Sequence, residues 1–166
     1  ERTMCTYLGI ANKLGEKEIK DNEIEQSELI LIEGYLWDTS EAKNAINKSI
    51  EIAKKNSTLI SLSLSDIFCV ERYKSEFLDL TKHKIDLLFG NEGEFKSLFE
   101  NNNMEQIIDE LKSFNKVFVI TLGEKGVVLV NKKEIIRVSS EKLEQVIDLT
   151  GAGDLFASGF IHGFTN

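Results

Sequence analysis

Short apolar runs alternate with helix-spaced apolar stripes along this chain, and no other feature restricts its fold as much. Continuous apolar segments at Leu29–Ile32, Leu59–Leu62 and Val117–Ile120 are typical of strands buried inside a parallel sheet. A stripe with helical spacing follows Asp38, and Asp38 and Glu41 have the spacing of a capping box. This order predicts an α/β fold with ligands at the carboxyl ends of the strands. The stripe consists of Ala42, Ala45, Ile46, Ser49, Ile50 and Ala53.

The remaining predicted elements continue the same alternation and end in a helix. We expect further helices near Lys74–Lys82, from about Gly93 to Glu100, along the stripe from Met104 to Phe114, and at Asp154–Phe164. We expect a strand at Asp86–Phe89 and a β-hairpin formed by Val127–Val130 and Ile135–Val138 around Asn131–Lys133.

Composition and charge narrow the classes of function. With 166 residues and no proline- or serine-rich linker, the chain is expected to form one domain or a large piece of one. Its formal net charge of −8 argues against nucleic-acid and anionic-membrane partners, since both require clustered Lys and Arg. No apolar run approaches the ~18 residues of a membrane span, and no secretory signal is visible, so we expect a cytoplasmic protein.

The segment Thr150–Asp154 carries the most specific chemistry. Its small residues precede a predicted helix, where backbone N–H groups and the helix dipole can form an anion site. Asp154 can take a proton from an attacking hydroxyl group. The plain alternative is a tight turn followed by a helix-start acid. A Rossmann dinucleotide loop does not fit, because Phe156 stands where a third glycine is needed, and the chain has no P-loop sequence.

Two further polar segments follow predicted strands. Asn91 and Glu94, after Asp86–Phe89, can hold a hydrated Mg²⁺ ion and orient phosphate oxygens, because Mg²⁺ prefers oxygen ligands and keeps its waters. The alternative is a capping box with Asn91 as N-cap and Glu94 as its partner, and both roles can coexist. Thr121–Gly126 follows Val117–Ile120; its glycines can bring backbone against a nucleotide or form an ordinary turn.

These three elements, taken together and in this order, resemble the ribokinase (PfkB) family. Asp148–Gly159 is similar to the C-terminal signature of that family, Asn91–Glu94 to its N-x-x-E motif and Thr121–Gly126 to its T-x-G-x-x-G nucleotide loop. Arg2–Met4 and Glu33–Asp38 are similar, more weakly, to an adenosine-kinase-like branch of bacterial sugar kinases.

The resemblance implies a ribokinase-like three-layer αβα fold with a mostly parallel sheet. It also implies ATP-dependent transfer of the γ-phosphoryl group to a hydroxymethyl group of a sugar or nucleoside, as in fructokinases, ribokinases and adenosine kinases. The residues assigned to catalysis are Asp154 as the base and Gly151, Ala152 and Gly153 as the anion hole. Those assigned to cofactors are Asn91 and Glu94 for Mg²⁺, Thr121, Gly123 and Gly126 for ATP, and Asp148 and Thr150 for a monovalent cation or a phosphate-side loop.

Family members are much longer than this chain, which affects what it can do alone. We expect residues 1–166 to form a single partial catalytic domain that lacks the N-terminal acceptor and lid region and the C-terminal end. Such a chain would not phosphorylate a sugar by itself, and its exposed apolar surface would favour a homo-oligomer. A non-catalytic nucleotide- or small-ligand-binding module on the same fold is the second hypothesis. Tyr35 and Trp37 follow a predicted strand and either line the acceptor side or belong to the core or an interface.

Overall fold

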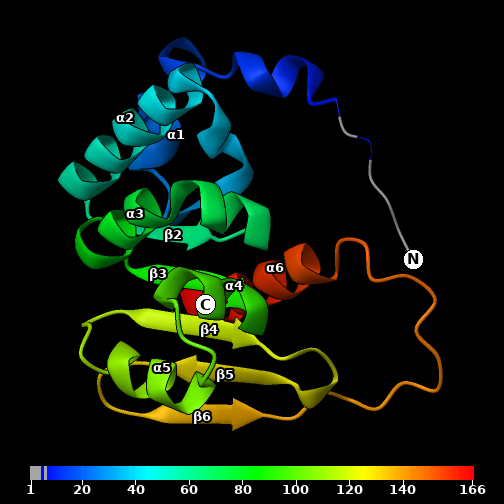
Figure 1. Cartoon of the computed structure of the whole chain (residues 1–166). Helices are drawn as coiled ribbons and strands as arrows, with labels where there is room; N and C mark the ends of the chain where they lie inside the picture. The colour runs from blue at the N-terminus through cyan, green and yellow to red at the C-terminus, as the bar shows by residue number, and fades with distance from the viewer. Residues whose placement is uncertain (1–4, 6) are drawn as a thin grey trace.

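The protein forms a six-stranded sheet whose strands lie side by side in sequence order (Figure 1). The computed structural model describes residue 5 and residues 7–166, so Arg2–Met4 lie outside the described residues. The first four strands are parallel, and the last two run antiparallel to their neighbours. The strands are β1 (Leu29–Glu33), β2 (Leu59–Ser63), β3 (Leu87–Asn91), β4 (Val117–Thr121), β5 (Val127–Val130) and β6 (Ile135–Val138).

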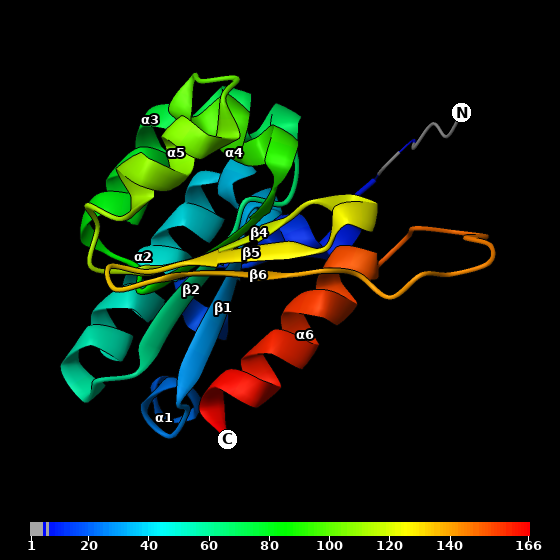
Figure 2. The same ribbon diagram turned by 90° about the horizontal axis from the view of Figure 1, so that it is seen from below.

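Helices cover both faces of the sheet, as Figure 2 shows, which gives three layers. Four helices, α2 to α5, pack on one face around a core that includes Phe77, Phe95 and Phe118. On the other face, Phe160 of α6 meets Phe89 edge to face in a smaller core. The helices are α1 (Asp21–Glu25), α2 (Ser40–Asn56), α3 (Ile67–His83), α4 (Glu92–Phe99), α5 (Met104–Leu111) and α6 (Ala152–Thr165), with 3-10 turns η1 (Gly9–Lys13), η2 (Glu16–Glu18), η3 (Gly34–Asp38) and η4 (Gly123–Lys125).

All six predicted strands are confirmed, and β3 is shifted toward the site. It begins at Leu87 rather than Asp86 and continues to Asn91, which pairs with Thr121 of β4. The predicted hairpin of β5 and β6 is confirmed as well. Its turn is stabilised by the Asn131 side chain, which accepts hydrogen bonds from the backbone N–H groups of Lys133 and Glu134.

The helix after β1 is confirmed, but its predicted cap is wrong. The apolar stripe of α2 is buried as expected. Thr39, not Asp38, is the N-cap, because its extended backbone brings Oγ1 within 3.2 Å of the Ala42 N–H group. Asp38 instead accepts a hydrogen bond of 2.7 Å from the Tyr73 hydroxyl and forms an ion pair with Arg72.

Two helices begin earlier than the sequence pattern indicated. α3 starts at Ile67 rather than near Lys74, since Asp66 caps it by accepting a hydrogen bond of 2.8 Å from Cys69 N. A non-helical backbone at Tyr73 divides α3, and the predicted range covers only its second part. α6 starts at Ala152 rather than Asp154, because Gly151 reverses the chain with a φ of 76°.

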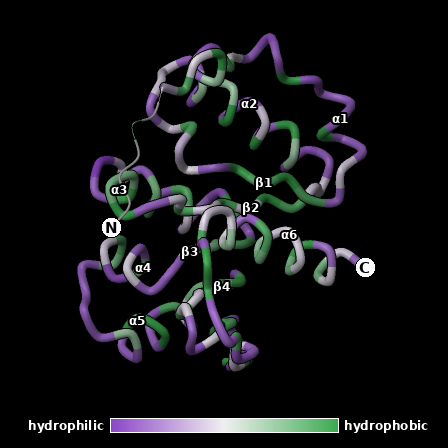
Figure 3. Tube along the Cα trace, turned by 90° about the vertical axis from the view of Figure 1, so that its right-hand side faces the viewer, coloured by the Kyte–Doolittle hydropathy of each residue, from purple (hydrophilic) through white to green (hydrophobic). Residues whose placement is uncertain are grey.

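The hydropathy of the trace follows this layering. Figure 3 shows apolar residues concentrated along the strands and along parts of the helices, while many connecting segments are hydrophilic. In the part of the chain that the structure describes, no helix combines the length and apolar character that crossing a bilayer requires.

Candidate active site

The carboxyl ends of β1 to β4 meet along one edge of the sheet, where the predicted site residues gather. Glu33 pairs with Ser63 across β1 and β2, and Asn91 pairs with Thr121 across β3 and β4. Helices α3, α4 and α6 all begin at this edge (Figure 1, Figure 2). Several helix N-termini therefore direct their partial positive charge toward the same region.

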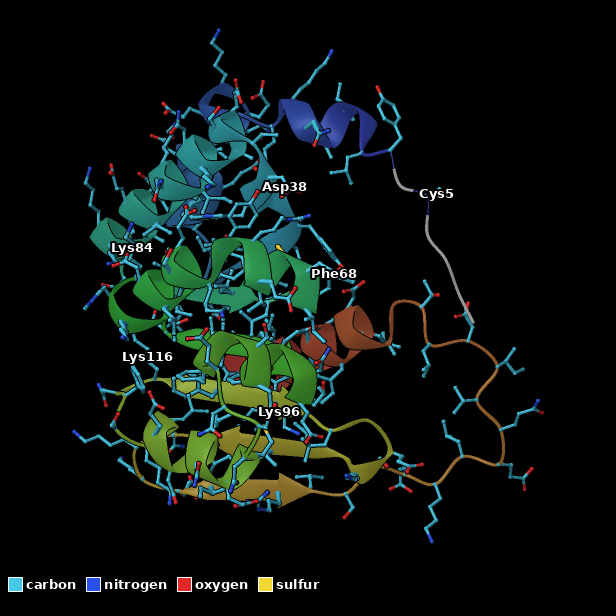
Figure 4. The ribbon with its side chains drawn as sticks, viewed as in Figure 1. Cys5, Asp38, Phe68, Lys84, Lys96 and Lys116 are labelled. Atoms are coloured by element: carbon cyan, nitrogen blue, oxygen red, sulfur yellow. The ribbon has the colours of Figure 1, made fainter. Side chains whose placement is uncertain are left out.

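The opposite edge of the sheet has a different character. Figure 4 shows Phe68, near the start of α3, on the carboxyl side, and Lys84 and Lys116 on the other side. The Lys116 ammonium group donates to the Ile85 carbonyl oxygen, and burial lowers its pKa. Lys84 donates to Asn47 Oδ1 at 3.5 Å, so both lysines contact residues of other segments, away from the predicted site residues.

Asn91 and Glu94 form a closed capping box at the start of α4. Asn91 Oδ1 accepts from Glu94 N at 3.0 Å, while Glu94 Oε2 accepts from Asn91 N at 2.9 Å and Oε1 accepts from Asn91 Nδ2 at 2.6 Å. Glu94 is only 6% exposed. Burial raises the pKa of its carboxyl group, the hydrogen bond from Asn91 lowers it, and the nearby Asp66 raises it. The capping interpretation is therefore confirmed.

The same pair was predicted to bind Mg²⁺, and the geometry limits how it could do so. Within the described residues, no group of three or more His, Cys, Asp and Glu side chains could hold a metal ion. Both carboxylate oxygens of Glu94 already accept a hydrogen bond from Asn91. Each oxygen keeps a second lone pair, so the pair fits a hydrated ion contacted through water and phosphate better than direct chelation.

The Thr121–Gly126 loop lies beside Asn91 at the end of β4. Gly123 and Gly126 have φ values of 61° and 99°, which residues with a side chain rarely adopt. A Cβ atom on Gly126 would lie 2.0 Å from the Val138 carbonyl oxygen, so this glycine is required by the close approach of two backbones. Nothing lies within 4 Å of a Cβ on Gly123, so the loop is open on that side.

The small residues before Asp154 form the first turn of α6 and are exposed. Gly151 is its N-cap and has no side chain to bond the first N–H groups, and a Cβ atom there would meet nothing within 4 Å. Ala152 N donates to Leu149 O at 3.1 Å, so that N–H group already has a partner. Asp154 lies in the acidic first turn, where the helix dipole favours a carboxylate.

Asp148 and Thr150 are in contact just before this turn. Asp148 Oδ1 accepts hydrogen bonds from Thr150 N at 2.9 Å and from Thr150 Oγ1 at 2.8 Å. This bonding shapes the approach to Gly151 as an Asx-turn. The predicted cation or phosphate role of the two residues stays a prediction.

Glu33 is a candidate site residue for which no role was predicted from sequence, although it begins the Glu33–Asp38 segment that resembles an adenosine-kinase-like branch. It ends β1 and is half-buried. Burial raises the pKa of its carboxyl group, a hydrogen bond from Ser65 lowers it, and the Asp154 carboxylate raises it. The Asp154 carboxylate, distant in the sequence, thus influences the pKa of Glu33 through its charge. The position of Glu33 could have indicated it in the sequence, because ligands bind at the carboxyl ends of parallel strands and Glu33 follows the predicted strand Leu29–Ile32.

Tyr35 and Trp37 differ in their surroundings. Trp37 is 4% exposed, and its Nε1 donates to Glu76 Oε2 at 2.7 Å, so it belongs to the core, one of the two predicted alternatives. Tyr35 is 49% exposed and its hydroxyl donates to the Ser65 carbonyl oxygen at 3.2 Å. Tyr35 therefore lies at the site edge next to Glu33.

Comparison with known proteins agrees with this arrangement. A family model described as pfkB family carbohydrate kinase matches residues 1–166. The solved adenosine kinase of Sinorhizobium meliloti is 41% identical with a TM-score of 0.89, over 93% of this chain and 47% of that chain. An Escherichia coli protein assigned as a ribokinase II, solved with ATP and Mg²⁺, has a TM-score of 0.78 at 24% identity, over 90% of this chain and 49% of that chain.

Curated relatives show how the length of this chain compares with that of whole kinases. The adenosine kinase of Schizosaccharomyces pombe is 26% identical over 96% of this chain and 52% of its own length. The chain spans about half the length of the curated relatives that it matches first. The predicted α/β, ribokinase-like fold is confirmed by these structures. With a family model that covers its entire length, the chain belongs to the pfkB family of carbohydrate kinases.

Proposed function

We propose that this chain forms the catalytic half of an ATP-dependent kinase that phosphorylates a hydroxymethyl group of a sugar or nucleoside. The observation that carries the proposal is the position of Asp154. It lies in the first turn of α6, in the electrostatic neighbourhood of Glu33, and within the range matched by the pfkB family model. Curated relatives include an adenosine kinase, a ribokinase and a 5-dehydro-2-deoxygluconokinase, which supports the sugar or nucleoside class.

Asp154 acts as the general base in this proposal. Its carboxylate takes the proton of the acceptor hydroxyl as that oxygen forms a bond to the γ-phosphorus, and the bond from this phosphorus to the bridging oxygen breaks to release ADP. The backbone at Gly151, Ala152 and Gly153 stabilises charge on the transferring phosphoryl group, because the N-terminal N–H groups of a helix lack partners within it. The first turn of α6 suits this role, because it is exposed and its N-cap Gly151 has no side chain to bond these N–H groups. The Ala152 N–H group would exchange its hydrogen bond to Leu149 O for one to the phosphoryl group.

ATP is assigned to the β4 side of the edge. Thr121, Gly123 and Gly126 would contact the nucleotide, and the open space at Gly123 supports a close approach. Asn91 and Glu94 would orient a hydrated Mg²⁺ ion, which supplies positive charge against the phosphates when bound. Asp148 and Thr150 would hold a monovalent cation or support the phosphate-side loop.

The chain by itself is proposed to be inactive. It spans about half of its curated relatives, so residues for acceptor binding and for closing the nucleotide site would come from outside it. Phosphoryl transfer to ribose, fructose or adenosine by the 166-residue chain alone would disprove this part of the proposal.

A thermal-shift experiment separates a kinase from its competitors. Mg-ATP should raise the Tm of the chain and NAD should not, and Asp154→Asn should retain the ATP shift. In a full-length protein that contains the chain, the same substitution should abolish phosphoryl transfer. A full-length protein that binds Mg-ATP but transfers no phosphate to any acceptor would favour the alternative, a non-catalytic nucleotide- or small-ligand-binding module on the same fold.

A further inference from the structure

Ser65, in the turn after β2, has an unusual backbone conformation. Its φ of 69° lies in the left-handed region, which costs energy for a residue with a side chain. Two other described residues share this conformation without being glycine, Ser57 and Glu100, and each ends a helix as its C-cap. Ser65 is not at the C-terminus of a helix, so helix capping does not explain its positive φ.

The Ser65 hydroxyl connects the turns after two neighbouring strands. Oγ donates to Glu33 Oε2 at 3.2 Å, with the Ser63 carbonyl oxygen as a second acceptor at 3.4 Å, and it accepts from Tyr35 N at 3.3 Å. The Ser65 carbonyl oxygen accepts from the Tyr35 hydroxyl at 3.2 Å. Ser65 therefore contacts both the carboxylate that ends β1 and the turn that follows it.

The turns after β1 and β2 are closely packed where Gly34 meets Ser65. A Cβ atom on Gly34 would lie 2.9 Å from the Ser63 carbonyl oxygen and 3.1 Å from Ser65 Oγ. On the other side, the buried Cys69 thiol donates to the Gly34 carbonyl oxygen at 3.1 Å. The strained Ser65 therefore lies in a closely packed junction of two turns, and strain of this kind is typical of functional sites.

We propose that Ser65 is a positioning residue that fixes the direction of the Glu33 carboxylate at the carboxyl edge of the sheet, on the β1 side of the proposed site. This inference rests on the proposed function, in which the acceptor hydroxyl reaches Asp154. β1 and β4 are separated by three strand steps, or roughly 14 Å at the usual spacing. Ser65 should therefore act on the acceptor and not on ATP, which is assigned to the loop after β4.

The Ser65 hydroxyl affects the protonation of Glu33. Burial and the Asp154 carboxylate both favour the neutral form of Glu33, whereas hydrogen bonding with Ser65 and, less strongly, with Ser63 favours the charged form. Without the Ser65 hydroxyl, the Glu33 side chain would lose the stronger of these two interactions and hold a proton more readily. Asp154 is the charged neighbour that enters this balance.

The test compares two serines with the same backbone strain. Ser65→Ala and Ser65→Gly remove the hydroxyl, and only glycine relieves the strain. Ser57→Ala and Ser57→Gly repeat the pair at the C-cap of α2, where φ is 60°. In the 166-residue chain, carbon-detected NMR follows the pKa of the Glu33 carboxyl group. In a full-length kinase that contains the chain, the KM values for acceptor and Mg-ATP are measured.

Both Ser65 variants should raise the pKa of Glu33 and raise the acceptor KM roughly tenfold, the value of one hydrogen bond to a charged group. The KM for Mg-ATP should stay unchanged, and the glycine variant should have the higher Tm of each pair. The Ser57 variants should reproduce only the difference in Tm. If Ser65→Ala leaves both Glu33 and the acceptor KM unchanged, or Ser57→Ala shifts them equally, Ser65 has no positioning role. A wild-type full-length protein without phosphoryl transfer would instead overturn the proposed function, and the acceptor role with it.

Discussion

The starts of α4 and α6 are two helix N-termini at the same edge of the sheet, yet they are built in opposite ways. At α4, the Asn91 and Glu94 side chains bond each other and the backbone, and Glu94 is buried. At α6, Gly151 caps without a side chain, and Asp154 is exposed. The first arrangement satisfies its own polar groups and stabilises the fold. The second has no side chain bonded to its first N–H groups and keeps its carboxylate exposed, which is the arrangement that the proposed catalysis requires.

The largest expected effect comes from removing the charge at the α6 end. In a full-length kinase that contains the chain, Asp154→Asn should lower kcat by about 100- to 10,000-fold, because the acceptor hydroxyl loses its base. The Tm should hardly change, since Asp154 is exposed. Asp109→Asn, an exposed carboxylate on α5, is the matched control and should leave kcat unchanged. An Asp154→Asn enzyme with near-normal kcat would assign the base elsewhere.

The second effect should appear at the α4 end and in stability. Asn91→Ala removes the side chain that accepts from Glu94 N and donates to Glu94 Oε1. We expect a loss of about 1–3 kcal/mol in the free energy of unfolding, from a lost cap and a buried carboxylate with one partner fewer. Urea unfolding of the chain measures it. A loss below that of Asn103→Ala, an exposed N-cap at the start of α5, would mean that burial adds nothing to the capping box.

A smaller effect should separate stability from activity within α6 itself. Nothing lies within 4 Å of a Cβ atom on Gly153, and its φ is not in the left-handed region, so Gly153→Ala should stabilise the chain by about 0.5–1 kcal/mol. Gly151→Ala should destabilise it, because φ there is 76°. If Gly153 approaches the transferred phosphoryl group, the more stable variant should also have a lower kcat in the full-length kinase. A normal kcat would remove Gly153 from the anion hole.

The sequence was sufficient for the strands and for most helices, because burial in a parallel sheet requires continuous apolar runs such as Val117–Ile120. It was less reliable where a side chain had several partners to choose from. Asp38 had the spacing of a cap, but the tertiary fold places Tyr73 and Arg72 beside it and leaves capping to Thr39. Tertiary contacts of this kind cannot be derived from spacing along one helix.

The site shows the same division. Asn91, Thr121 and the turn before Asp154 were predicted from their motifs, and the structure places Asn91 and Thr121 side by side. Glu33 lies only in the more weakly similar segment Glu33–Asp38, and its electrostatic relation to Asp154 exists only once the sheet and α6 are assembled. Pairs formed by distant segments are therefore the part of a site that a single sequence does not reveal.

The smallest effect is a difference in pH dependence between two acids in the first turn of α4. Burial raises the pKa of Glu94 above its ordinary value of 4.5, so the folded state binds this proton more tightly than the unfolded state does. Its stabilising contribution is complete below 4.5 and is lost as pH rises through the folded pKa. For Glu92, the hydrogen bond from Lys96 lowers the pKa, so its contribution is present above 4.5 and is lost as pH falls through the folded value.

Substitution of each acid by its amide tests both signs in one experiment. Urea unfolding across the acidic range should show the Glu94→Gln variant gaining on the wild type as pH rises. The Glu92→Gln variant should lose ground over the same range, and by less, since this side chain is 36% exposed and its ion pair is screened by solvent. Parallel curves for the two variants would show that burial does not distinguish Glu94 from an ordinary acid at a helix start. The starts of α4 and α6 would then differ in their side-chain hydrogen bonds and not in the effect of burial.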